Sequence, residues 1–200
     1  MIEIPFWNDF YSIVSPENKN EIIEHCLNAV ELPQQEFKWG EHCLSEKVYL
    51  KLTGFSDLLK PNIIEALSEV IDVHYGFSVY EIWKNTYHRY YHQESHSHTG
   101  SDLSFVIFMD DYKENDAKFY FLNERGRVTS EVWTGLSDTM GDSISIEPER
   151  GDILFFPSHM LHGVTPHKSD TPRITVSGNI KLRDLRAVSY THLRAHETIV

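Results

Sequence analysis

The stretch that decides the fold is "EPERGDILFFPSHMLHGVTP", residues 147–166. Arg150 and Gly151 supply a turn, and the apolar run Ile153–Phe156 follows it directly. A run this short, bounded by turn residues, is typical of a strand buried inside a sheet. His162 lies just beyond the run. The stretch therefore predicts a β-rich core with a histidine placed near a strand end.

The same pattern of short apolar runs separated by turn residues continues on both sides of this stretch. Short β-type runs are "FSVYEIW" (77–83), "LSFVIFM" (103–109), "KFYFLN" (118–123), "SISIEP" (143–148), "DILFFP" (152–157) and "RITVSGNI" (173–180). The segments "NERG", "ERGD" and "PHKSDTP" supply turns between them. No alternation of strands and helices follows, so a parallel α/β sheet is not expected. The runs predict a mostly β fold, a jelly roll or barrel.

Two amphipathic segments precede the β-rich region. "SPE" at 15–17 is a helix start, because a hydroxyl can cap the first turn and proline suits its first position. The apolar residues that follow at helical spacing are Ile22, Ile23, Cys26, Leu27 and Val30, ahead of Pro33. A second helix is expected after Pro61, with Ile63, Leu67, Val70, Ile71 and His74 on one face and Gly76 closing it. Both helices are expected to pack against the sheet.

Length and composition fit one globular domain. The chain has 200 residues, of which 40% are hydrophobic, and no apolar run approaches the length of a membrane span. We expect a single domain over residues 1–187, helical in 1–76 and a helix-buttressed jelly roll in 77–187. The acidic start of the chain does not resemble a secretory signal. Cys26 and Cys43 are too few for a disulfide framework, so a cytoplasmic setting is expected. The net charge of −12 disfavours binding to duplex nucleic acid.

The last stretch, "VSYTHLRAHET" at residues 188–198, resembles a translated sequencing-library adapter. Residues 188–200 are therefore expected to be a non-native tail and are left out of the fold prediction. On this interpretation the gene comes from an environmental (metagenomic) assembly, and His192 and His196 are not ligands.

Histidines cluster in "HQESHSHTG", residues 92–100. If this segment is a strand, His96 and His98 point to one face and can share an ion. Chance alone yields ~0.5 such pairs among the histidines of residues 1–187, so the pair by itself is a weak signal. His162 would add a third imidazole from a distant strand, as a facial metal site requires. His159 and His167 are interpreted as exposed residues outside the site.

The run "RITVSGN" carries the other polar group of interest. In a strand, Arg173, Thr175 and Ser177 share one face. Burying an inward arginine requires an anionic partner, and its planar fork suits a carboxylate. That partner is either a bound carboxylate ligand or an internal aspartate or glutamate.

Together these motifs resemble the 2-oxoglutarate- and Fe(II)-dependent oxygenases. His-x-His stands before "LSFVIF", the stretch at 147–166 follows, and "RITVSGN" begins eleven residues after His162. The resemblance covers Tyr80 to Leu182 and is greatest to a phage and marine-bacterial branch related to prolyl hydroxylases. It implies a double-stranded β-helix that uses Fe(II), O₂ and 2-oxoglutarate. It also implies that Arg173, with Thr175 beside it, binds the distal carboxylate of 2-oxoglutarate.

The motif His96-Ser97-His98 differs from that of most of the family, which has His-x-Asp or His-x-Glu at this place. We expect His96, His98 and His162 to bind the iron, with Asp102 as the alternative to His96 in a set with His98 and His162. Aromatic residues that flank the motif and are candidates for lining the pocket are Trp83, Tyr87 and Tyr91.

The resemblance implies a dioxygenase that decarboxylates 2-oxoglutarate to succinate and hydroxylates a substrate. A peptidyl side chain is the first choice of substrate and a small molecule the second, in the cytoplasm or, for a phage protein, the host cytoplasm. Two alternatives are a cupin-type metal protein and a non-catalytic jelly-roll binding domain. Arg173 discriminates against the cupin, which has no need of an inward arginine after the last ligand.

Overall fold

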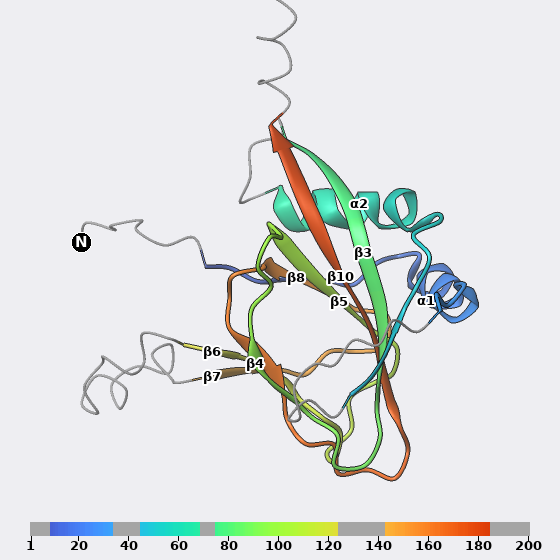
Figure 1. Ribbon diagram of the computed structural model, residues 1–200, viewed down its shortest axis with the longest axis vertical. Coiled ribbons are helices and arrows are strands. Elements are labelled where there is room, and N and C mark those ends of the chain that lie inside the picture. The colour runs from blue at the N-terminus through green and yellow to red at the C-terminus, as the bar shows by residue number, and fades with distance from the viewer. Residues whose placement is uncertain (1–8, 34–44, 69–74, 124–142, 185–200) are drawn as a thin grey trace, which may run out of the picture.

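The computed structural model describes residues 9–33, 45–68, 75–123 and 143–184 (Figure 1). Several sequence predictions concern residues outside these ranges and stay predictions. They are the helix positions Val70, Ile71 and His74, most of the "NERG" turn, and the tail at 188–200.

Two antiparallel sheets form the body of the molecule (Figure 1). The six-stranded sheet has the order β1 (Ser12–Val14), β8 (Ile153–Pro157), β5 (Leu103–Phe108), β10 (Arg173–Asp184), β3 (Tyr75–Tyr87), β2 (Glu46–Tyr49). The four-stranded sheet has the order β4 (Gln93–His96), β9 (His162–Val164), β6 (Phe119–Leu122), β7 (Ser143–Ile146). The predicted mostly β jelly roll is confirmed, and each of the six predicted runs overlaps a strand.

Four strands were not predicted, because they are short or polar. β4 has the sequence "QESH" and β2 the sequence "EKVY", and both lie at the edge of a sheet. Edge strands face water on one side and need no continuous apolar run, so hydrophobic periodicity does not reveal them.

The strand alternation divides the interior into two clusters. In β5, Phe105 and Ile107 pack with the helices, whereas Val106 and Phe108 pack between the two sheets. Because both faces are covered, every residue of β5 is buried. This explains why "LSFVIF" is a continuous apolar run rather than an alternating one. The space between the sheets is where the site lies.

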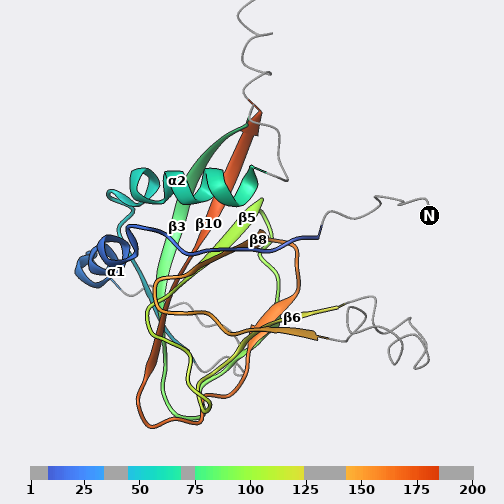
Figure 2. The ribbon, with the colours of Figure 1, turned by 180° about the vertical axis from the view of Figure 1, so that it is seen from behind.

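The helices cover the six-stranded sheet on the side away from the four-stranded sheet (Figures 1 and 2). Helix α1 (Lys19–Asn28) buries Ile22, Ile23 and Cys26, as predicted. The prediction is wrong for Leu27 and Val30, each 63% exposed, because the helix has only one buried stripe and ends at Asn28. The proposed cap at residue 15 is also wrong, since the Ser15 hydroxyl donates to the Asp152 carboxylate instead.

Helix α2 (Phe55–Leu67) begins earlier than predicted and contains Pro61 in its interior. Proline lacks the N–H of an interior helical bond, and this is why the sequence reads as a helix start there. Burial of Phe55, Leu59 and Ile63 in the core keeps the helix continuous through the proline. Gly76 was expected to close this helix but lies in strand β3.

Gly178 permits the close approach of β10 to its neighbours. It pairs with Phe105 on β5, and an added Cβ would overlap that ring. The glycine in "RITVSGN" therefore serves strand packing. No helix among the described residues is long and apolar enough to cross a membrane.

Candidate metal and cosubstrate site

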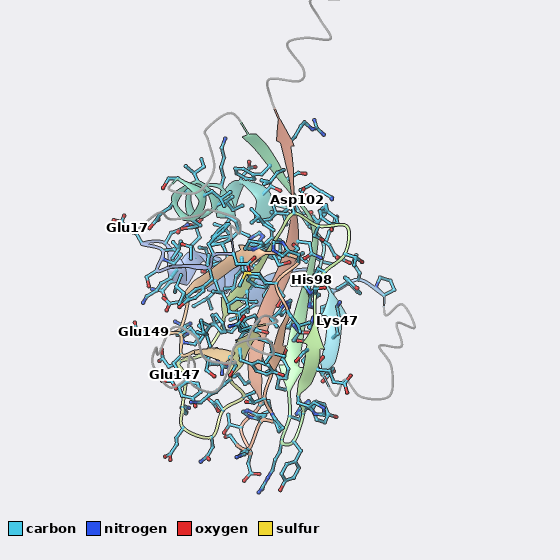
Figure 3. The ribbon with its side chains drawn as sticks, turned by 90° about the vertical axis from the view of Figure 1, so that its left-hand side faces the viewer. Glu17, Lys47, His98, Asp102, Glu147 and Glu149 are labelled. Carbon is cyan, nitrogen blue, oxygen red and sulfur yellow. The ribbon has the colours of Figure 1, made fainter. Side chains whose placement is uncertain are left out.

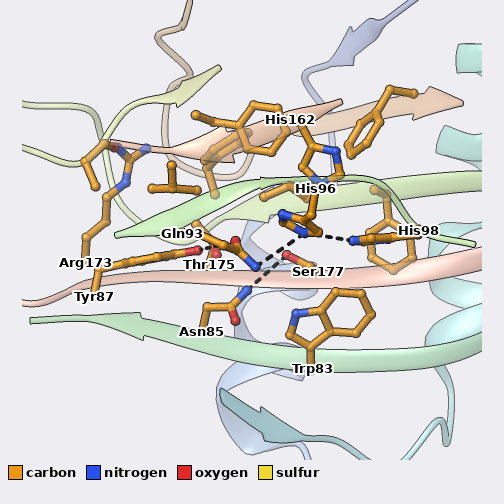
Figure 4. A pocket seen from close by; sticks show the side chains of 17 residues that line it. Trp83, Asn85, Tyr87, Gln93, His96, His98, His162, Arg173, Thr175 and Ser177 are labelled. Carbon is orange, nitrogen blue, oxygen red and sulfur yellow. Dashed lines mark hydrogen bonds between the residues drawn. The ribbon is translucent and has the colours of Figure 1, made fainter. Parts of the chain in front are cut away.

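A pocket lies between the two sheets and is lined from both (Figure 4). Its lining comprises Trp83, Asn85, Tyr87, Gln93, His96, His98, Phe105, Val106, Phe108, Ala117, Phe119, Phe156, His162, Val164, Arg173, Thr175 and Ser177. Figure 4 shows the labelled imidazoles at one end and Arg173 at the other. The predicted ligands and the predicted arginine therefore belong to one pocket.

Strand pairing places two of the imidazoles. His96 is the last residue of β4 and lies directly opposite His162, the first residue of β9. His98 lies beyond the end of β4, where its backbone N–H donates to Ser158 (2.8 Å). The predicted convergence of His96 and His98 occurs, but not through strand alternation, because the strand stops at His96.

One ring nitrogen from each of His96, His98 and His162 lies within 4.8 Å of the other two. The Nε2 atoms of His96 and His98 are 3.2 Å apart. Each Nδ1–H donates to an oxygen: His96 to Glu94 (2.8 Å), His162 to Met160 (2.9 Å) and His98 to Asn179 (2.8 Å).

These hydrogen bonds from Nδ1 determine the protonation of the Nε2 atoms that face one another. With the proton on Nδ1, each neutral imidazole directs the lone pair of its Nε2 toward the other two. Lone pairs that face one another at this distance repel, and a cation among them turns the repulsion into binding. The donor set fits a divalent transition metal, for which imidazole is a common ligand.

Burial keeps the imidazoles neutral. It lowers the pKa of His96 to about 4 and that of His162 to about 3, and it also lowers the pKa of His98. Phe119 stacks on the His162 ring, with centroids 5.4 Å apart. Lys47, on the same side of the molecule as His98 (Figure 3), also lowers the pKa of His96 and His98. Neutral imidazole is the form that binds metal, so the site is ready for a cation at neutral pH.

Asp102, the alternative ligand, is held away from the imidazoles. Its carboxylate accepts the backbone N–H of Leu182 (2.8 Å) and lies 3.8 Å from the ammonium of Lys181. The residue is exposed and is not one of the group of three. The geometry thus brings His96 together with His98 and His162 and leaves Asp102 out of the group.

The other two histidines lie outside the group, as expected, for different reasons. His159 is exposed and contacts Asp9 at 2.9 Å. His167 was expected to be exposed but is fully buried. Its Nδ1 accepts the N–H of Ala117 and its Nε2–H donates to the carbonyl of Thr171, so both ring nitrogens are used.

Arg173 occupies the other end of the pocket and is 3% exposed. Its Nη1 donates to the carbonyl of Ala117, and its ring-facing contacts are to Phe108 and Tyr112. Nη2 has no hydrogen-bond partner among the described residues. Burial lowers the pKa of the guanidinium, while Asp116 acts in the opposite direction. A buried cation with an unpaired donor fits a carboxylate ligand.

The remaining residues predicted for the pocket fall into two groups, those that line it and one that does not. Thr175, Trp83 and Tyr87 line the pocket as predicted, and all three are buried. Tyr91 is not in the lining; it packs at the margin of the inter-sheet cluster and against the His88 ring (5.2 Å).

Polar residues that the sequence prediction missed also line or support the pocket. They are Asn85, Gln93, Ser104 and Asn179, whereas Ser177 lines the pocket on the face that the sequence predicted for it. Odd-numbered positions of β3 lie opposite those of β10, from Glu81 and Asn179 at one end to Tyr87 and Arg173 at the other. The alternation already used for Arg173 could have found Asn179 and, by pairing, the inward residues of β3.

Fold and site together define a class: a jelly-roll protein with a candidate metal site of three histidines and a buried arginine in one pocket. A family model described as "Putative 2OG-Fe(II) oxygenase" matches residues 81–179, about half of the chain. The chain belongs to the 2OG-Fe(II) oxygenases, oxidoreductases that use iron, 2-oxoglutarate and O₂. No curated protein matches the sequence.

Solved structures of this class share the fold. The epimerase SnoN from nogalamycin biosynthesis is 14% identical with a TM-score of 0.57, covering 86% of this chain and 76% of its own. HygX from Streptomyces hygroscopicus, with nickel and 2-oxoglutarate bound, is 12% identical with a TM-score of 0.55, covering 86% and 82%. A 2OG-Fe(II) oxygenase family protein from Burkholderia pseudomallei is 9% identical with a TM-score of 0.57, covering 86% and 84%.

Proposed function

We propose that this protein is a dioxygenase that couples decarboxylation of 2-oxoglutarate to succinate with hydroxylation of a substrate. In this proposal the Nε2 atoms of His96, His98 and His162 hold Fe(II). The guanidinium of Arg173, with the hydroxyl of Thr175, holds the distal carboxylate of 2-oxoglutarate. The observation that carries the proposal is that one pocket joins three converging imidazoles to a buried guanidinium with an unpaired N–H.

Iron(II) with 2-oxoglutarate and O₂ supplies the oxidation of a substrate C–H bond. The residues of the chain bind, orient and exclude water. The outer hydrogen bonds of the imidazoles keep the metal-facing nitrogens deprotonated. Arg173 fixes the far end of an extended dicarboxylate, so that the other end points toward the histidines. Phe108, Phe119 and Phe156 make the wall apolar and limit water near the reacting groups.

The cosubstrate assignment is tested by anaerobic reconstitution with Fe(II), followed by measurement of succinate formed from 2-oxoglutarate in air. Uncoupled turnover lets the assay run without the substrate. Wild type is expected to produce iron-dependent succinate, and His162→Ala and Arg173→Ala are expected to lose it. Arg89→Ala, which removes an exposed arginine paired with Asp170, is the matched control and keeps activity. Absence of iron-dependent 2-oxoglutarate binding or turnover in wild type contradicts the proposal.

A peptidyl side chain is the proposed substrate, by analogy with prolyl hydroxylases. A small molecule is the second candidate, because a fold neighbour, HygX, has been solved with hygromycin B bound. Stimulation of succinate formation by a proline-containing peptide pool, with oxygen gained by a peptide in mass spectrometry, would support the first. Stimulation only by a small-molecule pool would support the second.

The cytoplasmic location, the relation to the phage and marine-bacterial branch and the exclusion of duplex nucleic acid are also proposals. The first rests on the cysteine count, the second on the motifs, and the third on the net charge of −12.

A further inference from the structure

We propose that Glu81 and Asn179 are positioning residues that hold His98 as the third metal ligand, in place of the carboxylate that most of the family uses. The inference rests on the metal site proposed above. It assigns a task to two residues that do not themselves contact the metal position. It also explains how an imidazole outside any strand is held at a fixed place and in a fixed protonation form.

The first observation is a row of residues across three strands. Asn179 on β10 lies directly opposite Glu81 on β3 and directly opposite Ser104 on β5. The register of β10 with β3 shifts immediately after Asn179, so this row is the last before the bulge. Side chains in one cross-strand row on the same face are close enough to contact. The strands therefore place the three polar groups together at the end of the pocket where His98 lies.

The second observation is that the hydrogen bonds of the Asn179 amide have only one consistent direction. The Nδ2 amide of Asn179 donates to the Glu81 carboxylate (2.8 Å), which can only accept. The Asn179 Oδ1 is therefore the atom that faces Ser104 (3.0 Å) and His98 Nδ1 (2.8 Å). An amide oxygen accepts, so His98 carries its proton on Nδ1 and presents the Nε2 lone pair to the metal position.

The third observation is the contrast with the other two imidazoles. His96 and His162 each donate to a backbone carbonyl two residues earlier, so the neighbouring backbone fixes the orientation of each ring. His98 instead depends on two side chains from other strands, Asn179 on β10 (2.8 Å) and Ser104 on β5 (2.9 Å). Substituting Asn179 therefore removes the shorter of these two restraints on His98, without touching any ligand.

The row of Ser104, Asn179 and Glu81 ends in the negative charge of the Glu81 carboxylate. Three neutral imidazoles leave a bound dication without a negative ligand from the protein. The Glu81 carboxylate is connected to His98 through the Asn179 amide. Tyr49 lies near the same carboxylate, which contributes to raising the pKa of its hydroxyl. An outer carboxylate that acts through a histidine increases the basicity of that ligand toward a metal.

The experiment measures Co(II) binding by titration calorimetry and by the visible absorption of the bound ion, anaerobically and on the full chain. The variants are Asn179→Ala, Glu81→Ala and Glu81→Gln. Asn62→Ala is the matched control, since Asn62 is a buried asparagine of α2 distant in sequence from every ligand. Thermal melting of each metal-free variant separates a general loss of stability from a specific loss of metal binding.

Asn179→Ala is expected to weaken Co(II) binding ~10- to 100-fold, as is typical when an outer partner of a ligand is lost. Its absorption spectrum is expected to change, because His98 no longer coordinates in the same orientation. Glu81→Gln keeps an acceptor for the amide but removes the charge, so a smaller loss is expected than in Glu81→Ala. Asn62→Ala is expected to bind Co(II) as wild type does, whatever its melting temperature.

Wild-type affinity and spectrum in Asn179→Ala would overturn the inference while leaving the metal site intact. A wild-type protein that binds Co(II) no better than His162→Ala would overturn the metal site and the inference together. An equal loss of affinity in Asn62→Ala would show that the effect is loss of fold rather than positioning, and would also overturn the inference.

Discussion

At the imidazole end of the pocket, the Nδ1 atom of each histidine donates to an oxygen of the chain, whereas at the guanidinium end one nitrogen of Arg173 has no partner among the described residues. The first end is arranged and neutral before anything binds. The second end holds a buried cation that lacks its anion. The difference supports the proposal that the two ends bind opposite charges and can be disabled separately.

The largest expected effect comes from removing the cation at the guanidinium end. Arg173→Met is expected to weaken 2-oxoglutarate binding to the Ni(II)-loaded protein by at least ~30-fold, because truncating one partner of a buried charge pair costs about 2–5 kcal/mol. Calorimetric titration with 2-oxoglutarate checks this. Ni(II) affinity is expected to stay unchanged, since the metal ligands are at the other end. Wild-type 2-oxoglutarate affinity in this variant would remove the assigned role of Arg173.

The same substitution also tests whether Arg173 serves the fold. Replacing a buried, incompletely paired charge with an apolar side chain of similar length is often neutral or stabilising. The metal-free variant is therefore expected to melt at or above the wild-type temperature. A large fall in melting temperature would mean that the bond to Ala117 and the ring contacts make Arg173 a structural residue.

The next effect concerns the imidazole end. Metal that binds only the folded state stabilises it by about 2.7 kcal/mol at a concentration 100 times its dissociation constant. Wild type is expected to melt at a higher temperature when Co(II) is added, and His162→Ala is expected to show no such rise. His159→Ala, which removes a histidine that is 70% exposed, is the control and is expected to respond like wild type. An equal rise in His162→Ala would place the metal elsewhere.

A smaller effect is the acid sensitivity of the metal-free protein. Burial lowers the pKa of His96 to about 4 and of His162 to about 3, from 6.5, so the unfolded chain binds protons that the folded protein excludes. The free energy of unfolding is therefore expected to fall as the pH drops from about 6.5 toward 4, and to be insensitive to these groups above that range. Urea unfolding across this range measures it.

His162→Phe keeps a ring against Phe119 and removes one of these titrating groups. Its unfolding free energy is expected to change less steeply with pH than that of wild type over the same range. An identical slope in the two proteins would mean that His162 is not held neutral by the fold.

The smallest effect lies between the two ends. The Tyr87 hydroxyl donates to Gln93 (3.2 Å), whose amide lies 3.5 Å from His96 Nε2. Tyr87→Phe removes this link and is expected to lower the unfolding free energy by about 0.5–1.5 kcal/mol, the usual contribution of one hydrogen bond. Co(II) affinity is expected to change less than the Asn179→Ala value. A loss of Co(II) binding as large as that variant's would show that the two ends are coupled.

The histidines and the arginine of the site were predictable from the sequence, because their residue types and spacing are typical of metal and carboxylate binding. His96, His98, His162 and Arg173 meet in one pocket, as the order of motifs indicated. The reason given for the His96–His98 pair was wrong, because strand β4, with the sequence "QESH", ends at His96 and does not include His98. Local pattern identified the residues but not the element that carries them.

Residues that depend on pairing between distant segments were not predictable from local pattern. Asn179 stands in a quoted motif, yet its role requires the register that sets it opposite Glu81 and Ser104. Similarly, α2 begins before Pro61 because tertiary burial of Phe55 and Leu59 outweighs the local signal of the proline. In each case long-range packing decided what the local sequence left open.

Strand β10 is central in the six-stranded sheet, yet in the chain it follows all its neighbours. During synthesis β3 and β5 are made long before the strand that must lie between them, so their inner edges stay unpaired until residues 173–184 leave the ribosome. His98 has no Asn179 to orient it before that moment. We therefore expect iron loading to follow the emergence of β10, and nascent chains to need protection of these edges from aggregation.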